Sequence, residues 1–221
     1  MAWRLRLLFL LLSPIMVGGC DMLPTGRGDA PARPAAAVGG AAFASAESRQ
    51  CLADLGKASV AFEALPNRDF GGGCRTIDTV KLLDIGTPTT NLGALTCPLA
   101  RNFAAWAQYA VQPAARQMLG GQVVRIETMG SYACRNVNGA SSGKLSQHAF
   151  ANAVDVSAFV LADGRRISVE QGWNGSPQER AFLRALHASA CRRFGTVLGP
   201  DYNAAHYNHL HFDMSGDGYC R

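Results

Sequence analysis

The chain has 221 residues, of which 48% are hydrophobic and 17% are charged. This composition allows one domain with an ordinary hydrophobic core, and it excludes a chain that is disordered throughout. The formal net charge is +5, and no block of lysine and arginine occurs in the sequence. So small a charge does not favour nucleic-acid binding, and we expect no nucleic acid partner.

The first twenty residues have the pattern of an export signal. Arg4 and Arg6 form a basic start, and a mostly apolar run over residues 7–17 follows. This run is shorter than the ~20 residues that span a bilayer. It leads into Val17-Gly18-Gly19-Cys20, which resembles the lipobox of bacterial lipoproteins. We therefore expect a signal peptide over residues 1–19 and a lipid on Cys20, with simple cleavage and secretion as the alternative.

The cysteines agree with export to an oxidising compartment. Seven occur, and six remain if Cys20 carries lipid. In an exported chain six cysteines imply three disulfides, although the sequence leaves their pairing open. No Cys-x-x-Cys pair occurs, which argues against a cysteine-ligated metal. The six residues are Cys51, Cys74, Cys97, Cys134, Cys191 and Cys220.

A tether is expected between the lipid anchor and the folded body. Residues 20–46 are rich in proline, alanine and glycine and contain few large apolar residues. Such a composition favours a disordered linker. The folded domain is therefore expected over residues 47–221.

The start of the body predicts a short helix followed by strands. The helix is expected over residues 48–55, with Gly56 as its stop. Alternating apolar residues predict a strand over 60–64, and a second short strand is expected over 79–83. The three glycines at 71–73 predict a loop between these two strands.

The clearest helix begins at Thr96. Pro98 stands in its first turn, and apolar side chains follow at helical spacing. Pro113 is expected to kink or restart the helix, because proline lacks the amide hydrogen that a helix interior uses. The Gly120-Gly121 pair is expected to end it.

Two predicted strands flank a long loop in the second half. Residues 123–129 favour a strand with Val124 and Ile126 on one face, and residues 153–161 predict the next strand. Residues 130–147 between them are polar and contain glycine. A loop of this length in a compact domain is often functional.

A hairpin and a helix are expected after residue 161. Asp163-Gly164 is a turn signal, so residues 165–169 are expected to return as a strand. Ser176-Pro177-Gln178-Glu179 is a capping box, which predicts a helix that continues to Phe194. A last strand is expected over 207–214. Helices and short strands mix without βαβ regularity, so the predicted fold class is α+β, a small antiparallel sheet with flanking helices.

Four of the five histidines fall in two short segments, 148–155 and 206–211. In the second segment, His209, His211 and Asp213 alternate with apolar residues. This period is typical of a half-buried strand, here one that presents two imidazoles and a carboxylate on one face. An ordinary strand with a polar outer face is the alternative.

The first histidine segment favours a metal site. His148 lies just before the 153–161 strand, and Asp155 lies on the polar face of that strand. Two imidazoles and one carboxylate supply three zinc ligands and leave a fourth position for water, as catalytic zinc requires. One zinc ion is therefore the expected cofactor. The alternative is a turn-capping His148 and an Asp155 paired with an arginine.

These residues also carry a family resemblance. Ser-x-His-x-x-x-x-Ala-x-Asp at 146–155, followed by His-x-His at 209–211, resembles the signature of LAS-type zinc peptidases, which include D-Ala-D-Ala carboxypeptidases and murein endopeptidases. Within that group, the segments 130–135, 198–203 and Cys220-Arg221 are similar to the extensin-like C-terminal family of bacterial proteins. The likeness extends from Cys51 to Arg221, and it implies a zinc-peptidase-like fold.

The resemblance implies a role for each candidate residue. His148, Asp155 and His211 match the zinc ligands. His209 matches a histidine that assists catalysis without binding the metal, and His206 occupies another position where some murein endopeptidases carry an active-site histidine.

Three further polar residues are expected around the metal. Arg135 stands where such enzymes bind a substrate carbonyl or carboxylate, which suits a guanidinium, and a surface arginine is the alternative. Ser146 is expected at the substrate site, where it orients the loop of His148 or is merely part of a polar loop. Asp213 either orients an imidazole from behind or forms a surface salt bridge.

Two positions depart from the family pattern. Ala151 stands where glycine is usual, which costs about 1 kcal/mol if the backbone there is left-handed. Asn208 stands where many relatives carry an Asp or Glu as general base, and a neutral amide cannot accept a proton. His209 or His206 would then take that role, for which a histidine pKa is suited.

The sequence therefore predicts a zinc metallopeptidase that cleaves peptide bonds in peptidoglycan, either as a carboxypeptidase or as an endopeptidase. We expect a monomer that acts on wall peptides in the periplasm of a Gram-negative bacterium, held at a membrane by lipid on Cys20. Because of Ala151 and Asn208, a wall-binding lipoprotein with little or no activity is the alternative. An extracellular metal-binding protein without a wall function is a third possibility.

Overall fold

The computed structural model describes residue 43, residues 45–216 and residues 218–221. The chain divides at Arg33, and every described residue belongs to the unit Pro34–Arg221. The predicted signal peptide, the lipid site at Cys20 and most of the predicted tether lie outside the described residues. Within the described part, no helix combines the length and apolar character that crossing a bilayer requires.

The first helix, α1 (Ala46–Lys57), begins two residues earlier than the sequence predicts. The Ser45 hydroxyl caps it by accepting a hydrogen bond from the Ser48 amide at 3.0 Å. Gly56 lies inside the helix and does not end it. Phe43 is 7% exposed and packs in the core, so the folded body includes residues ahead of the helix.

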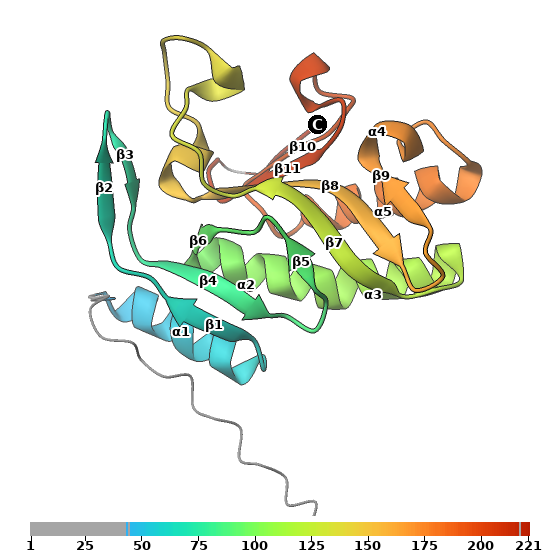
Figure 1. Cartoon of the computed structure of the whole chain (residues 1–221), viewed down its shortest axis with the longest axis horizontal. Helices are drawn as coiled ribbons and strands as arrows, with labels where there is room; N and C mark the ends of the chain where they lie inside the picture. The colour runs from blue at the N-terminus through green and yellow to red at the C-terminus, as the bar shows by residue number, and fades with distance from the viewer. Residues whose placement is uncertain (1–42, 44, 217) are drawn as a thin grey trace, which may run out of the picture. The chain divides into compact units, whose positions relative to one another are not determined.

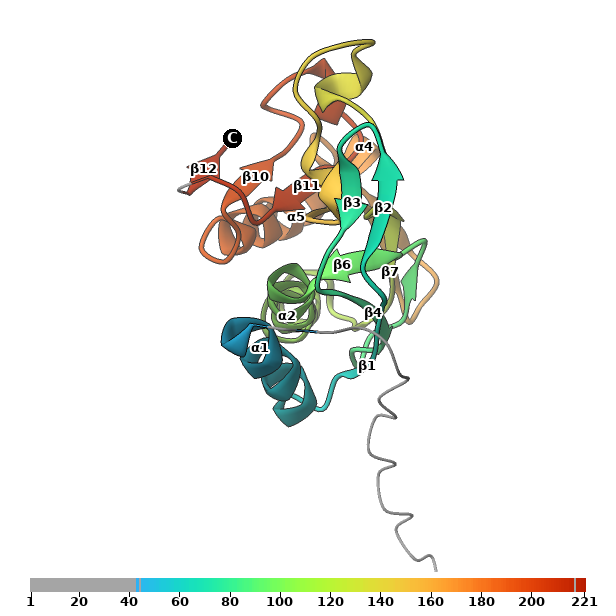
Figure 2. The ribbon, with the colours of Figure 1, turned by 90° about the vertical axis from the view of Figure 1, so that its left-hand side faces the viewer.

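Two small antiparallel sheets follow α1. One has three strands in the order β1-β4-β6, and the other is the hairpin β2-β3, which projects away from α1 in Figures 1 and 2. The predicted strands over 60–64 and 79–83 correspond to β1 and β4. The bounds are β1 (Ala61–Ala64), β2 (Arg68–Gly71), β3 (Cys74–Thr76), β4 (Thr79–Asp84) and β6 (Ala94–Thr96).

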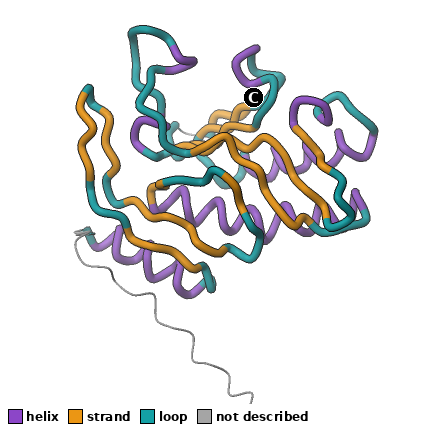
Figure 3. Tube along the Cα trace, in the orientation of Figure 1, coloured by secondary structure: helices purple, strands orange, loops and turns teal. Residues whose placement is uncertain are grey.

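A long helical run packs beneath the larger sheet (Figure 3). It begins with Pro98 in the first turn, as the sequence predicts, and ends at Gly120, whose φ of 69° suits glycine. Pro113 does not break it. Five-residue π-helical segments lie on either side of this proline, and such wide turns accommodate a missing amide donor. The parts are α2 (Cys97–Trp106), η1 (Ala107–Val111), α3 (Gln112–Ala114) and η2 (Ala115–Leu119).

The larger sheet has seven strands in the order β12-β10-β11-β8-β7-β5, with β9 also paired to β8. All pairs are antiparallel except β5 with β7 and β10 with β12. The α+β fold class is confirmed. The bounds are β5 (Thr89–Thr90), β7 (Val123–Gly130), β8 (Ala153–Leu161), β9 (Arg166–Ser168), β10 (Thr196–Leu198), β11 (Leu210–Asp213) and β12 (Tyr219–Cys220).

The remaining helices are short except for one. The capping box at Ser176 and Glu179 is formed, and it starts a helix that ends at Ala190, four residues before the predicted end. The hairpin partner of β8 is shorter than predicted, because the chain turns into a helix at Val169. The bounds are η3 (Val137–Gly139), η4 (Gln147–Phe150), α4 (Val169–Gly172), α5 (Pro177–Ala190) and η5 (Ala204–His206).

One face of the larger sheet forms the core. Val154, Val156 and Phe212 are fully buried there. Trp106 of α2 contacts Phe212 with ring centroids 5.0 Å apart and Phe159 at 6.0 Å. This packing leaves the alternate residues of β8 and β11 on the opposite face.

The predicted pairing of Val124 and Ile126 on one face of β7 is wrong. Val124 is 38% exposed, while Val123 and Ile126 are buried. The register of β7 against β8 shifts between Val123 and Arg125. A bulge of this kind inserts one extra residue and reverses the alternation of faces beyond it.

The three predicted disulfides are present. They join Cys51 to Cys97, Cys74 to Cys134 and Cys191 to Cys220. The first links α1 to α2, the second links the β2-β3 hairpin to the loop after β7, and the third links the end of α5 to β12.

Candidate metal centre

His148, Asp155 and His211 converge on the face of the larger sheet that is turned away from the core. Asp155 and His211 are register partners on the adjacent strands β8 and β11, which Figure 1 shows side by side. His148 lies on η4, just before β8. Each of the three residues is less than 9% exposed. The alternation of β8 and β11 thus places two of these side chains, and the turn before β8 places the third.

The separations of the donor atoms fit a tetrahedral ion. His148 Nε2 lies 3.1 Å from Asp155 Oδ2 and 3.3 Å from His211 Nδ1, and His211 Nδ1 lies 2.8 Å from Asp155 Oδ1. Donors about 2.0–2.1 Å from a tetrahedral zinc ion are about 3.3–3.4 Å apart. One ion can therefore reach all three donors after shifts of a few tenths of an ångström.

In each of the two histidines, the ring nitrogen that points away from the centre is held by a hydrogen bond. His148 Nδ1 donates to the Ser131 carbonyl at 3.2 Å, and His211 Nε2 donates to Asp213 Oδ2 at 3.0 Å. The other nitrogen of each ring faces the centre, where it can bind a metal ion once it is free of its proton. Metal-binding histidines almost always have such a partner behind them.

Asp213 is a buried part of this arrangement and not a surface salt bridge. It is 5% exposed, and its Oδ1 accepts hydrogen bonds from both the amide and the hydroxyl of Ser215, at 2.7 and 2.6 Å. Its other oxygen accepts from His211. Both carboxylate oxygens are thus fixed, and the imidazole of His211 is held in one orientation.

The electrostatics of the centre attract a cation. Burial opposes ionisation of Asp155, but hydrogen bonds from His148 and His211 hold the pKa of its carboxyl well below its usual range. Burial likewise opposes a charged His211, while hydrogen bonds to Asp155 and Asp213 raise its pKa to about 9. The two carboxylates therefore favour positive charge on the nitrogen that faces the centre, and a proton and a metal ion compete for it.

His206 and His209 lie beside the three converging residues. His209 Nε2 is 3.6 Å from Asp155 Oδ1, and the His206 ring centroid is 5.0 Å from that of His209. His209 Nδ1 donates to the side-chain oxygen of Asn208 at 2.9 Å, and His206 Nδ1 donates to that of Asn203 at 2.7 Å. In each neutral ring, Nε2 is then the acceptor.

The two histidines are neutral proton acceptors at neutral pH. Burial, and then the charges of His209 and His211, lower the pKa of His206 to about 4. Burial also lowers the pKa of His209, although the Asp155 carboxylate opposes this. A neutral imidazole can take up a proton in a reaction at neutral pH.

Asn208 and Ala151, the two unusual positions noted in the sequence, both have a visible structural role. The side-chain oxygen of Asn208 accepts a hydrogen bond from His209 Nδ1 and so holds the ring of His209 in place. Ala151 has a φ of 52°, which is the left-handed region that favours glycine. It ends η4, and its carbonyl accepts a hydrogen bond from the Thr96 amide at 2.8 Å.

A cleft of about 420 Å³ lies over the centre. One wall is the loop after β7, with Arg135 and Lys144, and the other includes the loop after β10. Both loops rise above the sheet in Figure 1. Arg135 is 40% exposed and lies 3.7 Å from Asp155, while Ser146 is buried and its hydroxyl accepts a hydrogen bond from the His148 amide. Ser146 thus supports the loop of His148.

Sequence reasoning missed several of these neighbours. Nothing in the sequence pointed to the Ser131 carbonyl or to Asn203, because their roles depend on chain segments that meet only in the fold. Lys144 and Tyr202 line the cleft and were likewise not singled out. For Lys144, its place in the long polar loop was the available signal.

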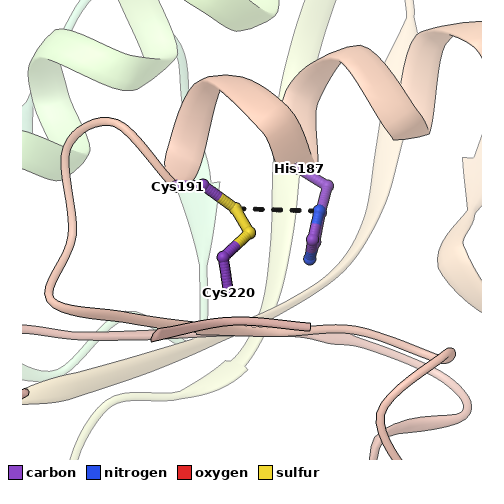
Figure 4. Close-up of side chains that lie close together, drawn as sticks. All are labelled: His187, Cys191 and Cys220. Atoms are coloured by element: carbon purple, nitrogen blue, oxygen red, sulfur yellow. Dashed lines mark hydrogen bonds between the residues drawn. A yellow bond between two sulfur atoms is a disulfide. The ribbon is translucent and has the colours of Figure 1, made fainter. Parts of the chain in front are cut away.

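A second group of potential ligands lies elsewhere. His187, Cys191 and Cys220 are close together, as Figure 4 shows. The two sulfur atoms are joined in a disulfide, so they offer no thiolate to a metal. His187 Nδ1 lies 3.8 Å from the Cys191 sulfur, and its Nε2 donates to the Arg221 backbone oxygen at 3.1 Å.

Comparisons with known proteins identify the family of the chain. No curated protein and no solved structure gives a match. The family model described as "Extensin-like protein C-terminus" matches residues 49–221 and thus covers all of the elements that build the centre. The chain therefore belongs to the extensin-like protein C-terminus family.

Proposed function

We propose that the protein is a zinc-dependent hydrolase that cleaves peptide bonds in peptidoglycan. The observation that carries the proposal is the donor set: two imidazoles, each held by a hydrogen bond on its far nitrogen, and one ionised carboxylate converge beneath an open cleft. Three protein ligands with an accessible fourth position are typical of catalytic zinc sites.

His148, Asp155 and His211 would hold the ion. When bound, zinc supplies a Lewis acid and lowers the pKa of a coordinated water to roughly 7. His209 is the residue best placed to move a proton, since its acceptor nitrogen faces Asp155. His206 is next to it and is the second candidate.

A histidine base is favoured because, in the described part of the chain, no free carboxylate lines the cleft. Among the described residues that line it, Asp213 is the one carboxylate, and both of its oxygens are engaged. Proton transfer to the leaving amine therefore falls to His209 or His206.

Arg135 is suited to hold the substrate. Its guanidinium is part of the cleft wall and lies on the same side of Asp155 as His148. With Lys144 it makes this wall positively charged, which fits a peptide carboxylate or carbonyl.

Three lines of support point to cell-wall peptides in the envelope. The pattern Ser146-x-His148 to Asp155 with His209-x-His211 resembles LAS-type zinc peptidases, which act on such peptides. Three disulfides are typical of exported domains. The lipobox-like segment at Cys20 supports a lipoprotein of the periplasm.

The test combines metal content with product analysis. Protein purified without chelators should contain about one zinc by elemental mass spectrometry, and it should release peptides or D-alanine from peptidoglycan fragments. His211→Gln should lose the zinc, and His209→Ala should keep it but lose turnover. His187→Gln, which alters the one histidine outside the centre, is the control for both measurements. A protein that binds no zinc overturns the proposal.

The alternative is a wall-binding protein without catalysis. Asn208 favours it, because that residue offers no proton acceptor. This alternative predicts zinc content and binding to peptidoglycan, but no product, and binding that His209→Ala does not change.

A further inference from the structure

Two exposed tyrosines extend the cleft beyond the metal centre. Tyr202 lines the cleft, and its ring contacts His206 with centroids 5.4 Å apart. It also contacts the ring of Tyr219, with centroids 6.0 Å apart and an interplanar angle of 82°. Tyr202 is 40% exposed and Tyr219 is 47% exposed. Together they form an aromatic strip that continues the cleft toward the β12 edge of the sheet.

The strand register places Tyr219 on the same face as the metal ligands. Asp155 pairs with His211, and His211 pairs with Leu198 of β10. Two residues before Leu198, Thr196 pairs with Tyr219 of β12. Paired residues point to the same face of a sheet, and so do residues two apart on one strand. A ligand that lies across the strands over the metal centre therefore reaches Tyr219.

Two hydroxyl groups beside the strip use their hydrogens in hydrogen bonds within the protein. Thr196 Oγ1 donates to the Ser215 carbonyl at 2.9 Å, and the Ser215 hydroxyl donates to Asp213 at 2.6 Å. Both residues line the cleft. Their remaining lone pairs can only accept hydrogen bonds, so this end of the cleft suits a ligand rich in O–H or N–H donors.

We propose that the Tyr202–Tyr219 strip is a subsite for a pyranose ring of a glycan strand. A pyranose combines an apolar C–H face, which packs on an aromatic ring, with hydroxyl donors around its edge, and the strip offers the matching features. This inference rests on the proposed function, in which the peptide lies over the metal. It adds that the enzyme recognises the sugar to which the peptide is attached.

The backbone that carries Tyr219 is tied to the rest of the fold. The Tyr219 amide donates to the Gly195 carbonyl at 2.9 Å, and the next residue, Cys220, is joined by a disulfide to Cys191 of the α5 C-cap (Figure 4). The Arg221 amide donates to the Val197 carbonyl at 3.0 Å. A subsite whose backbone is held in place in advance loses less entropy on binding.

A direct binding assay tests the subsite without requiring hydrolysis. The probe is a trimer of β-1,4-linked N-acetylglucosamine, titrated into the full protein and followed by NMR chemical shifts. Wild type should bind it, Tyr219→Ala should bind about fivefold more weakly, and Tyr219→Phe should bind like wild type, because it keeps the ring. Tyr109→Ala, which removes another exposed tyrosine from the helical run, is the matched control and should change nothing.

The outcomes separate this inference from the proposed function. No binding by wild type, or equal binding by Tyr219→Ala, overturns the subsite even if the protein hydrolyses peptides. Binding that depends on the Tyr219 ring supports it even if no hydrolysis is found. If hydrolysis is found, Tyr219→Ala should lower kcat/KM for disaccharide-linked peptides about fivefold and leave the value for sugar-free peptides unchanged.

Discussion

Replacing Asp213 by asparagine should weaken zinc binding by a change of tautomer in His211. The wild-type carboxylate accepts on both oxygens, from His211 Nε2 at 3.0 Å and from the Ser215 amide and hydroxyl at 2.7 and 2.6 Å. An asparagine side chain has one oxygen and one NH₂ group. Because the Ser215 amide can only donate, the oxygen is expected to stay with Ser215, and the NH₂ group then faces His211.

This arrangement would reverse the protonation of the imidazole. His211 Nε2 must become an acceptor, so the proton moves to Nδ1, the atom that faces the candidate metal centre. A protonated nitrogen has no lone pair for zinc. Substitutions of residues that support a ligand typically cost about 10–100-fold in metal affinity, or about 1.4–2.7 kcal/mol. Asp213→Asn should fall at the upper end of that range.

The measurement is a competition titration against a zinc-binding dye, with wild type and variant at the same pH. Asp163→Asn is the matched control, because Asp163 is exposed in the β8–β9 turn and pairs with Arg165. Circular dichroism should show that both variants are folded. If Asp213→Asn binds zinc as tightly as wild type, the assignment of His211 Nδ1 as the donor atom is refuted.

Two further predictions concern stability. Zinc at a hundred times its dissociation constant should add about 2.7 kcal/mol to the free energy of unfolding and raise Tm by roughly 5–10 °C in calorimetry. An unchanged Tm would argue against a zinc site that forms only in the folded chain. Burial lowers the pKa of His187 below its ordinary value of 6.5, so the unfolded chain binds that proton more tightly and stability is lost as pH falls below about 6.5. In urea unfolding, His187→Gln should therefore lose less stability than wild type between pH 7 and pH 5, and an identical loss would contradict this account.

The face that carries the candidate centre could be predicted because it depends on local alternation. His211 and Asp155 stand between apolar neighbours on their strands, so their direction follows from strand geometry alone. The capping box at Ser176 is equally local, and it forms as expected. The strand over 153–161 was predicted with its observed bounds.

What could not be predicted depends on distant partners. Strands β5, β10 and β12 are two or three residues long, too short to show a period, and they exist only because longer strands lie beside them. The bulge that turns Val124 outward has no sequence signal, because it depends on how β7 pairs with β8. Disulfide pairing was open for the same reason: the partners lie 29, 46 and 60 residues apart and meet only in the finished fold.

The pairing of β11 with β8 also guards against misfolding. If β11 slid by one residue, His211 and Asp213 would face the core, and Phe212 would face water. Such a chain would bury two polar side chains away from the groups that now satisfy them, which costs several kcal/mol. The polar residues that build the cleft floor thus penalise the nearest wrong alignment of the sheet, so a chain that misaligns this sheet loses both its stability and its chemistry.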